Sequence, residues 1–328
     1  MLPDVIDYDH GISAVDSGYH RPRLDAIHLI VEAGRVAVVD TGVSHSVPRI
    51  LAALAAKNLR PEQVEYVMLT HIHLDHAGGA GALMAACPQA RLTVHPRGAR
   101  HMADPAKLVE GTVAVYGAAR FLREYGTVRP IPADRITETS DGATIAMGGR
   151  RFRFLDTPGH AKHHVAIVDE RSGHLFAGDT FGVSYRELDD GGRQFAIPTT
   201  SPVHFEPAAA HRSVERIVAE RPGAVYVTHY SQVRDVARCA EALHRGIDAH
   251  AALARSVLAW VHDGVDDGAH DARMARLQTG VRGIFLDELA RYGGKLAPDD
   301  ALALYAMDLD LNAQGLASWL EAGAPAGG

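Results

Sequence analysis

The chain has 328 residues, of which 47% are hydrophobic and 22% are charged, a balance that argues against a disordered or fibrous chain. Its net charge of −7 gives no overall positive field for a phosphate backbone, so nucleic acid is not an expected partner. The sequence has no run of about 20 apolar residues for a membrane span, and its acidic start lacks the basic region of an export signal. We therefore expect a soluble, cytoplasmic protein with no membrane partner.

Cysteine and histidine usage points toward histidine-based metal chemistry. The two cysteines, Cys87 and Cys239, are far apart, which argues against a disulfide framework or a thiolate zinc site and suits a reducing compartment. The chain also has 20 histidines, a number that makes their spacing worth reading for metal ligands.

The first two thirds of the chain read as short apolar strands with helices between them. The predicted strands are residues 26–31, 35–40, 64–69, 91–95, 144–147, 151–155, 164–168, 174–177 and 224–228. The predicted helices are residues 47–57, 81–86 and 208–220, with a mostly helical insertion at 101–125. Two groups of strands with interspersed helices indicate a layered α/β fold.

Strand signals end near residue 233, and Ala, Leu, Arg and Asp then recur at helical spacing up to residue 320. We therefore expect a domain over residues 1–232 and a helical C-terminal extension over residues 233–328, which could pack on the same domain. Such an extension could also cover a cleft or form a contact in a homo-oligomer.

A cluster of candidate ligands follows the apolar strand 64–69 directly. Residues 70–76 read Thr-His-Ile-His-Leu-Asp-His and contain His71, His73, Asp75 and His76. Three imidazoles and a carboxylate are costly to crowd together unless a cation binds them, because charged rings repel and buried neutral rings need partners. A metal site explains this run better than a chance polar loop.

Three further apolar strands each end in a potential ligand. His160 follows a Thr-Pro-Gly turn, Asp179 follows Ala-Gly, and His229 follows Val-Thr. Each of these residues alone is an ordinary turn residue. Four separate strands that end in this way are seldom produced by a random scatter.

The order H-x-H-x-D-H, T-P-G-H, G-D and T-H resembles the metallo-β-lactamase superfamily over roughly residues 20–232. The resemblance implies an αββα sandwich with a binuclear metal site at one edge of its sheets. It further implies that His71, His73 and His160 hold one ion, that Asp75, His76 and His229 hold the other, and that Asp179 bridges them.

Asp40, in the run Val-Val-Asp-Thr-Gly, also matches a motif of the superfamily. Asp40 would either orient a metal-binding side chain through a hydrogen bond or serve as a hydrogen-bonding turn residue at a strand end.

Two metal ions can lower the pKa of water and stabilise a developing oxyanion, which gives hydrolysis of an ester, thioester, lactam or phosphoester. By its family counterparts, Asp75 would orient the nucleophile and move protons. We therefore expect a metal-dependent hydrolase of a small molecule, although fold alone does not specify a β-lactam substrate.

An all-imidazole and carboxylate ligand set suits zinc and iron alike. Residues 159–164 and 178–186 resemble a branch with oxygen-binding di-iron proteins, so a protein that binds or senses dioxygen is the alternative. No flavin or nucleotide is expected, because His73 stands where the flavodiiron pattern has Glu. Persulfide dioxygenases carry many of these ligands around a single iron, so the number of ions stays open.

Several neighbours of these ligands could contact substrate, each with a structural alternative. His164 could bind a substrate or open a strand, and His163 could be a surface residue. Tyr185 and Tyr230 could donate a phenol hydrogen bond or pack as aromatic rings. The loop 198–205, with its spare His204, could border the pocket or be a rigid connection.

Overall fold

The computed structural model describes residues 4–200, 205–262 and 269–323. The chain divides into two compact units. Unit 1 consists of Met1–Asp156, His163–Gly178 and Arg221–Gln232, and unit 2 of Thr157–Lys162, Asp179–Glu220 and Val233–Gly328. The last segment of unit 2 begins at Val233, directly after residue 232, where the first domain is predicted to end. The division into two domains itself stays a prediction.

The first sheet lies in unit 1 and keeps its strands in chain order. Its first four strands pair antiparallel, and the fourth to the seventh pair parallel. The strands are β1 (Val5–Asp7), β2 (Ile12–Asp16), β3 (Ala26–Glu32), β4 (Arg35–Val39), β5 (Val64–Met68), β6 (Arg91–Val94) and β7 (Ile136–Glu138).

The second sheet has the strand order β13-β12-β11-β10-β9-β8. Strands β8 to β11 pair antiparallel, whereas β11 and β12 pair parallel. The strands are β8 (Thr144–Met147), β9 (Arg150–Asp156), β10 (Val165–Asp169), β11 (His174–Gly178), β12 (Val225–Val227) and β13 (Ser231–Val233).

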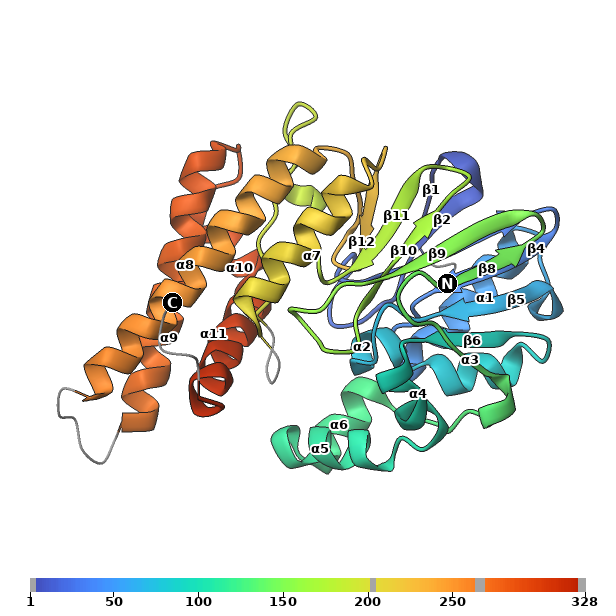
Figure 1. The fold of residues 1–328 in the computed structure, drawn as a ribbon, viewed down its shortest axis with the longest axis horizontal. Coiled ribbons are helices and arrows are strands. Elements are labelled where there is room, and N and C mark those ends of the chain that lie inside the picture. The colour runs from blue at the N-terminus through green and yellow to red at the C-terminus, as the bar shows by residue number, and fades with distance from the viewer. Residues whose placement is uncertain (1–3, 201–204, 263–268, 324–328) are drawn as a thin grey trace. The chain divides into compact units, whose positions relative to one another are not determined.

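Side chains alternate along the strands of the first sheet, whose strands are drawn as arrows in Figure 1, and they contribute to two cores in unit 1. On β4, Val36 and Val38 face a core shared with helices, while Ala37 and Val39 face a core shared with the second sheet. This follows from the two-residue period of a strand, which sends successive side chains to opposite faces. Because both faces are covered, β4 reads as a continuous apolar run.

The helices of unit 1 lie between the strands of the first sheet in the sequence. The predicted helical insertion is present as three separate helices, of which the second and third end at Gly117 and Gly126, while the other predicted helices agree within a few residues. The helices are α1 (Val47–Ala56), α2 (Leu74–Ala77), α3 (Ala80–Ala86), α4 (Pro96–Ala103), α5 (Ala106–Tyr116) and α6 (Ala118–Tyr125). Short 3-10 helices occur at Asp9–Gly11, Ser44–Ser46, Pro61–Gln63, Ala133–Arg135 and, in unit 2, Arg186–Leu188.

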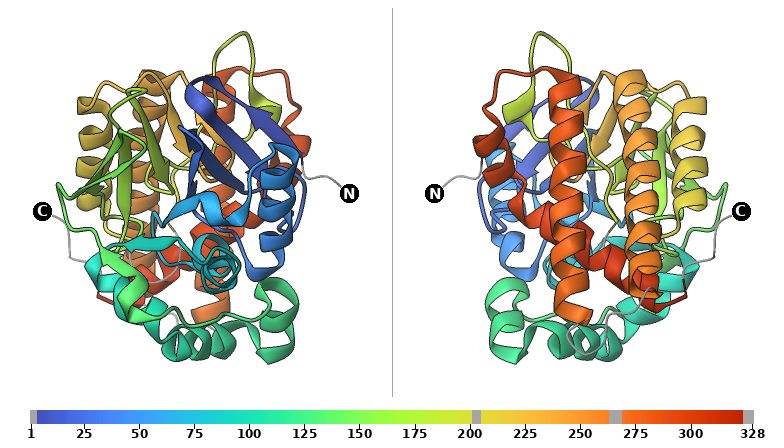
Figure 2. Two further views of the ribbon diagram at one scale, coloured as in Figure 1. Left: turned by 90° about the vertical axis from the view of Figure 1, so that its right-hand side faces the viewer. Right: turned by 90° about the vertical axis from the view of Figure 1, so that its left-hand side faces the viewer.

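Unit 2 is helical, and its long helices lie side by side (Figure 2). Helix α8 packs against α7 and α9, and α11 packs against α9. The helices are α7 (Pro207–Ala219), α8 (Val236–His262), α9 (Ala269–Tyr292), α10 (Pro298–Leu304) and α11 (Ala306–Glu321). The predicted helical C-terminal extension is therefore confirmed, as is the α/β class with two groups of strands.

The sequence analysis missed four short strands: β1, β2, β7 and β13. Strands of three residues, such as β1 and β7, have too few alternating positions to give a periodic signal. In β2, Ser13 and Asp16 interrupt the apolar pattern, yet all five residues are buried. Tertiary packing, rather than local pattern, places these segments in the sheets.

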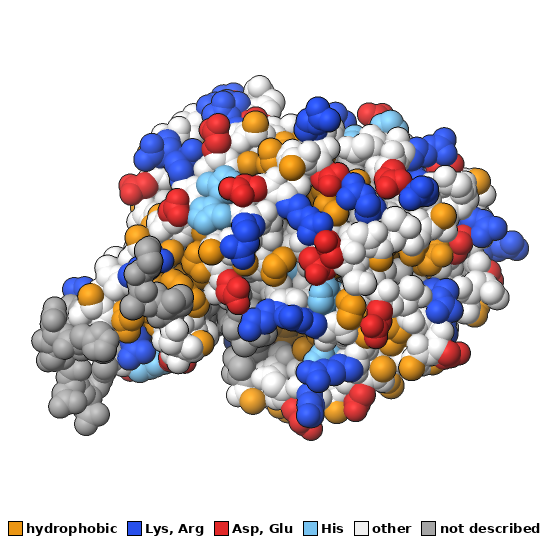
Figure 3. All heavy atoms as spheres, in the orientation of Figure 1, with side chains coloured by type: hydrophobic (Ala, Val, Ile, Leu, Met, Phe, Trp, Pro, Cys, Tyr) orange, Lys and Arg blue, Asp and Glu red, His pale blue; other side chains and the backbone are white. Residues whose placement is uncertain are grey.

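No helix in the described residues is long and apolar enough to cross a membrane. On the face drawn in Figure 3, basic and acidic side chains are interspersed.

A buried ion pair joins β9 to β10 within the second sheet. Arg150 is 1% exposed and Asp169 is 0% exposed. The Arg150 guanidinium donates through Nε to Asp169 Oδ1 at 2.9 Å and through a second nitrogen to Oδ2, a bidentate pair. It also donates to the carbonyl of His10, so the buried charges are satisfied from several sides.

We predict that Arg150→Leu destabilises the protein by about 3–5 kcal/mol, because it leaves the Asp169 carboxylate buried and uncompensated. Urea unfolding followed by circular dichroism measures this change. The matched control is Arg151→Leu, since Arg151 is 60% exposed in its pair with Glu170 and should cost less than about 1 kcal/mol. Equal losses in the two variants would contradict the role of the buried pair.

Candidate metal centre

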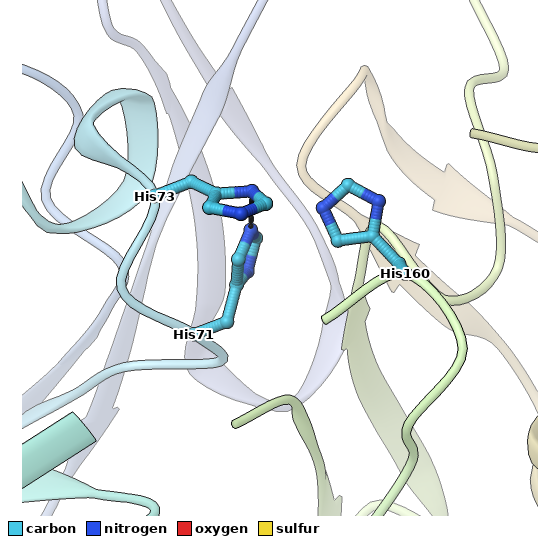
Figure 4. A group of neighbouring side chains, drawn as sticks. All are labelled: His71, His73 and His160. Atoms are coloured by element: carbon cyan, nitrogen blue, oxygen red, sulfur yellow. Dashed lines mark hydrogen bonds between the residues drawn. The ribbon is translucent and has the colours of Figure 1, made fainter. Parts of the chain in front are cut away.

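The loop after β5 brings two imidazoles of unit 1 together. His71 Nε2 lies 2.9 Å from His73 Nδ1, and Figure 4 shows the two rings edge to face with a dashed line between these atoms. His71 Nδ1 lies 3.2 Å from the hydroxyl of Thr70. This hydroxyl accepts from Nδ1–H, so His71 is left with the Nε2 lone pair for a ligand role, as expected from the tautomer rule.

Asp40 is the buried anchor behind this loop. It directly follows β4 and is 2% exposed. Its carboxylate accepts from the backbone N–H of Thr70 at 2.8 Å and from the Thr228 hydroxyl at 3.2 Å. It also binds His76 Nδ1 at 2.9 Å, which fixes the proton on Nδ1 and leaves Nε2 as the donor atom for a cation.

His229 lies beside a second buried carboxylate, Asp25, and its Nδ1 is also within 3.4 Å of the Leu24 carbonyl oxygen. The His229 Nδ1 atom lies 2.8 Å from Asp25 Oδ1, and Asp25 is 0% exposed. Burial raises the pKa of the Asp25 carboxyl, and the neighbouring His229 ring opposes that rise. The pair is therefore one buried unit that fixes the plane of the His229 ring.

Asp75, His76 and His229 form a candidate metal triad within unit 1. Each offers one ligand atom, and these atoms lie within 4.8 Å of one another. Asp75 Oδ2 is 3.5 Å from His76 Nε2 and 3.8 Å from His229 Nε2. Both rings thus direct Nε2 toward one carboxylate oxygen, with a carboxylate behind each Nδ1.

His160 and Asp179 are paired within unit 2. His160 Nε2 lies 3.5 Å from Asp179 Oδ2, and both residues are 5% exposed. The Thr199 hydroxyl lies 2.8 Å from His160 Nδ1 and donates to the Asp179 carbonyl at 3.2 Å. Thr199 accordingly accepts from Nδ1–H and leaves Nε2 of His160 facing the Asp179 carboxylate.

A small cavity of unit 2 borders this pair. Leu243 and Ile247 of α8 contribute apolar side chains to it, and Thr199 belongs to its wall. Residues 201–204, including the predicted His204, lie outside the described residues, so the role predicted for that part of the loop stays a prediction.

The two histidines after His160 lie against the first two candidate ligands. The His164 ring stacks on His71 with centroids 4.8 Å apart, and His163 meets His73 edge-on at 5.7 Å. Gly178 makes this packing possible: its φ is +49°, and a Cβ there would lie 2.6 Å from Thr70 Oγ1 and 2.7 Å from His164 Nε2. A contact of His164 with substrate stays a prediction.

The two tyrosines singled out from the sequence have different surroundings. In unit 2, the Tyr185 hydroxyl donates to the Asp308 carboxylate of α11 at 3.1 Å, so its described hydrogen bond ties together parts of that unit. In unit 1, Tyr230 is fully buried next to His229, and burial raises the pKa of its phenol. The substrate contacts predicted for both tyrosines stay predictions.

Sequence reasoning missed Asp25 and the part that Thr199 has in holding His160. Asp25 precedes the strand β3 and is separated by about 200 residues from its partner His229, so no local spacing connects them. Thr199 lies in the loop 198–205, for which the sequence predicts only that it borders the pocket or forms a rigid connection. The available signal was the presence of carboxylate and hydroxyl residues next to other apolar segments, since such residues often orient the histidines that bind a metal ion.

Imidazole nitrogens with carboxylates behind them, together with carboxylate oxygens, are the donor set that zinc and iron prefer. The residues of unit 1 therefore fit a divalent metal ion, since three ligand atoms are close together and two rings have fixed tautomers.

The model of the metallo-beta-lactamase superfamily matches residues 22–229. The chain belongs to the metallo-β-lactamase superfamily, which confirms the predicted membership and fold. The matched region contains every candidate ligand described above.

The chain is also similar to a curated protein and to several solved structures. The metallo-beta-lactamase fold-containing protein ST1585 of Sulfurisphaera tokodaii is 25% identical over 225 residues, which cover 67% of this chain and 78% of that protein. The crystal structure of ST1585 from Sulfolobus tokodaii has a TM-score of 0.58 at 24% identity over 71% of this chain and 84% of that chain.

The metallo-beta-lactamase family protein TTHA1429 from Thermus thermophilus has a TM-score of 0.63 at 21% identity, and the match covers 97% of this chain and 95% of that chain. The chemotaxis sensor ODP, solved as a peroxy diiron species, has a TM-score of 0.52 at 16% identity over 74% of this chain and 94% of that chain. These two likenesses show a shared fold.

We predict that Asp25→Asn lowers the affinity of the triad of Asp75, His76 and His229 for a divalent ion about 10- to 100-fold, because an amide holds the His229 ring less firmly and makes it a weaker base. Competition with a chromophoric zinc chelator measures the affinities. Asp134→Asn is the control, since Asp134 is exposed. An Asp25→Asn variant with unchanged affinities would show that the buried carboxylate does not support a ligand.

Proposed function

We propose that the protein is a metal-dependent hydrolase of a small molecule with an ester, thioester, lactam or similar bond. His71, His73 and His160 hold one metal ion in this proposal, and Asp75, His76 and His229 hold the second. Asp179 bridges the two ions. The match of the superfamily model to residues 22–229 supports the ligand order.

One observation carries the proposal: two buried carboxylates hold the Nδ1 atoms of two imidazoles whose Nε2 atoms approach the same Asp75 oxygen. The distances from Nδ1 to the carboxylates are 2.9 Å for His76 and 2.8 Å for His229. A carboxylate behind a ligand histidine fixes the tautomer and raises the basicity of the metal-binding nitrogen.

When bound, a pair of divalent ions lowers the pKa of water and stabilises negative charge that develops on the substrate. Asp75 is suited to move the proton of the attacking water, because its side chain is 27% exposed whereas those of His76 and Asp40 are almost fully buried. His76 and His229 stay fixed while this happens, since each is tied to a carboxylate that the solvent does not reach.

Unit 2 supports a substrate with an apolar part. Leu243 and Ile247 line the cavity that borders His160 and Asp179. The apolar side chains of α8 would exclude water from one side of a bound substrate, while Thr199 keeps His160 oriented.

A second candidate is a non-haem di-iron protein that binds or senses dioxygen. The fold likeness to the chemotaxis sensor ODP, solved as a peroxy diiron species, favours it, and the ligand set suits iron as well as zinc. In this alternative His163 and His164, which pack on His73 and His71, would shape the surroundings of a bound gas molecule.

Elemental analysis of protein expressed in unsupplemented medium separates the two candidates. We predict two zinc ions per chain, a featureless visible spectrum and turnover of at least one member of an ester, thioester and lactam panel. Iron together with a visible band that forms only after exposure to oxygen, and no turnover of the panel, would overturn the hydrolase in favour of dioxygen binding.

We predict that Asp179→Ala lowers metal content and activity together, because both ions lose a shared charged ligand. Metal content after dialysis and turnover of the same sample are the measurements. Asp134→Ala serves as the control from an exposed position and should retain both. Full occupancy with wild-type turnover in Asp179→Ala would remove the bridging role.

A further inference from the structure

Two histidines meet between helices α7 and α8 of unit 2. His211 belongs to α7 and His244 to α8, and these helices pack against each other. The two Nδ1 atoms lie 2.6 Å apart, and the ring planes differ by only 10°. Both residues are half-buried, and the side chain of His211 is 25% exposed, so solvent and ions reach the pair. Neither residue is among the candidate ligands of the metal centre described above.

A carboxylate orients one of the two rings. Asp248 lies one helical turn after His244 on α8, and its Oδ1 atom is 2.9 Å from His211 Nε2. The carboxylate accepts the proton of Nε2, which leaves the lone pair of His211 on Nδ1, directed at the other ring. His244 Nδ1 donates its proton to that lone pair, since two lone pairs at 2.6 Å would repel. A metal-binding histidine with a carboxylate behind it has this same arrangement, which Asp40 forms with His76.

The charges around the pair favour a cation. Burial lowers the pKa of the His244 ring, and the neighbouring His211 adds to this effect, whereas Glu215 and Asp248 oppose it. Glu215 lies one turn after His211 on α7 and is exposed. The guanidinium of Arg245, next to His244, donates to a carboxylate of α9, which compensates its charge. Two imidazoles with two carboxylates around them are thus open to a divalent cation.

The pair needs only a small adjustment to bind an ion. Zinc binds imidazole nitrogen at about 2.0–2.1 Å with tetrahedral angles, which places two ring nitrogens about 3.3 Å apart. From the present 2.6 Å, the rings have to separate by roughly 0.7 Å, which half-buried side chains at a helix surface allow. The proton of His244 Nδ1 moves through solvent to Nε2 of the same ring. The ring stays neutral, and its Nδ1 lone pair becomes available to the ion.

The contact between α7 and α8 also borders the candidate ligand His160. Ala210 and Leu243, which directly precede the two histidines, belong to the wall of the cavity at His160. Helix α7 supports the turn before His160, since a Cβ at Gly159 would be 2.5 Å from the Cα atom of Ala210. An ion bound by the two histidines would therefore fasten together the helices that form this wall.

We propose that His211 and His244 form a further binding site for a divalent transition-metal ion such as zinc, with Asp248 orienting His211 and with Glu215 or water completing the coordination. Zinc, copper and nickel bind imidazole, whereas magnesium and calcium prefer oxygen ligands. The ion joins two helices and acts as a structural clamp. The site does not depend on the proposed hydrolase function, because it shares no ligand with the candidate metal centre.

Zinc counting in variants tests the site. Full-length protein is equilibrated with a range of buffered free zinc concentrations, and bound zinc per chain is measured by elemental analysis. We expect His211→Ala and His244→Ala each to bind one ion fewer than the wild type. The control is His270→Ala on α9, whose side chain is 68% exposed, and it should bind as many ions as the wild type. Equal counts in the wild type and both variants over the whole range would overturn the proposal.

The expected difference of one ion is the same whatever the occupancy of the candidate metal centre, so a failure of the hydrolase proposal leaves this test intact. An excess of magnesium should not displace the ion, because imidazole nitrogens suit zinc and not magnesium. Displacement by magnesium would contradict a histidine site.

A substitution behind the ring tests the role of Asp248. Asp248→Asn should retain the ion and weaken its binding about 10- to 100-fold, because an amide orients His211 less firmly. An unchanged affinity would show that Asp248 does not act through His211.

Anomalous diffraction at the zinc edge from zinc-soaked wild-type crystals locates the ion without any substitution, so the proposal stays testable if a variant fails to fold. We expect a peak beside the Nδ1 atoms of His211 and His244. A soaked crystal without a peak at this position would overturn the site.

Discussion

The carboxylate of Asp40 is the constraint on which the candidate metal triad of Asp75, His76 and His229 depends. It joins the end of β4 to Thr70 after β5, to His76 and to Thr228 after β12, and so ties strands of both sheets to one buried charge. A carboxylate in this position is stable only when such donors surround it. The same bonds that satisfy the charge fix the strand ends and the His76 ring, so the fold and the site share one set of interactions.

Most of the candidate ligands could be predicted from the sequence, because the end of an apolar strand can be recognised from the residue pattern alone. His71, His160, Asp179 and His229 each follow a run that the structure places in or beside a strand. The order of these motifs along the chain resembles that of the superfamily, and this resemblance implied how the ligands are divided between the two ions.

What could not be predicted depends on contacts distant in sequence. Asp25 meets His229 across about 200 residues, and Thr199 meets His160 across 39. Strand β2 is buried along its whole length, although its Ser and Asp break the apolar pattern. Such features follow from tertiary packing and satisfied polar groups, which a local periodicity does not encode.

The two compact units contribute different things to the proposed chemistry. Unit 1 supplies rings with fixed tautomers, which suits a task that needs metal affinity and little movement. In unit 2, the candidate ligand His160 is oriented by the neutral hydroxyl of Thr199. The residue before Thr199, Pro198, packs directly against the backbone of α8 at Gly246, where there is no side chain. A neutral hydrogen bond is weaker than one to a carboxylate. The orientation of His160 therefore depends on a weaker hydrogen bond than the orientations of His76 and His229, and on how α8 packs against the loop that contains Pro198 and Thr199.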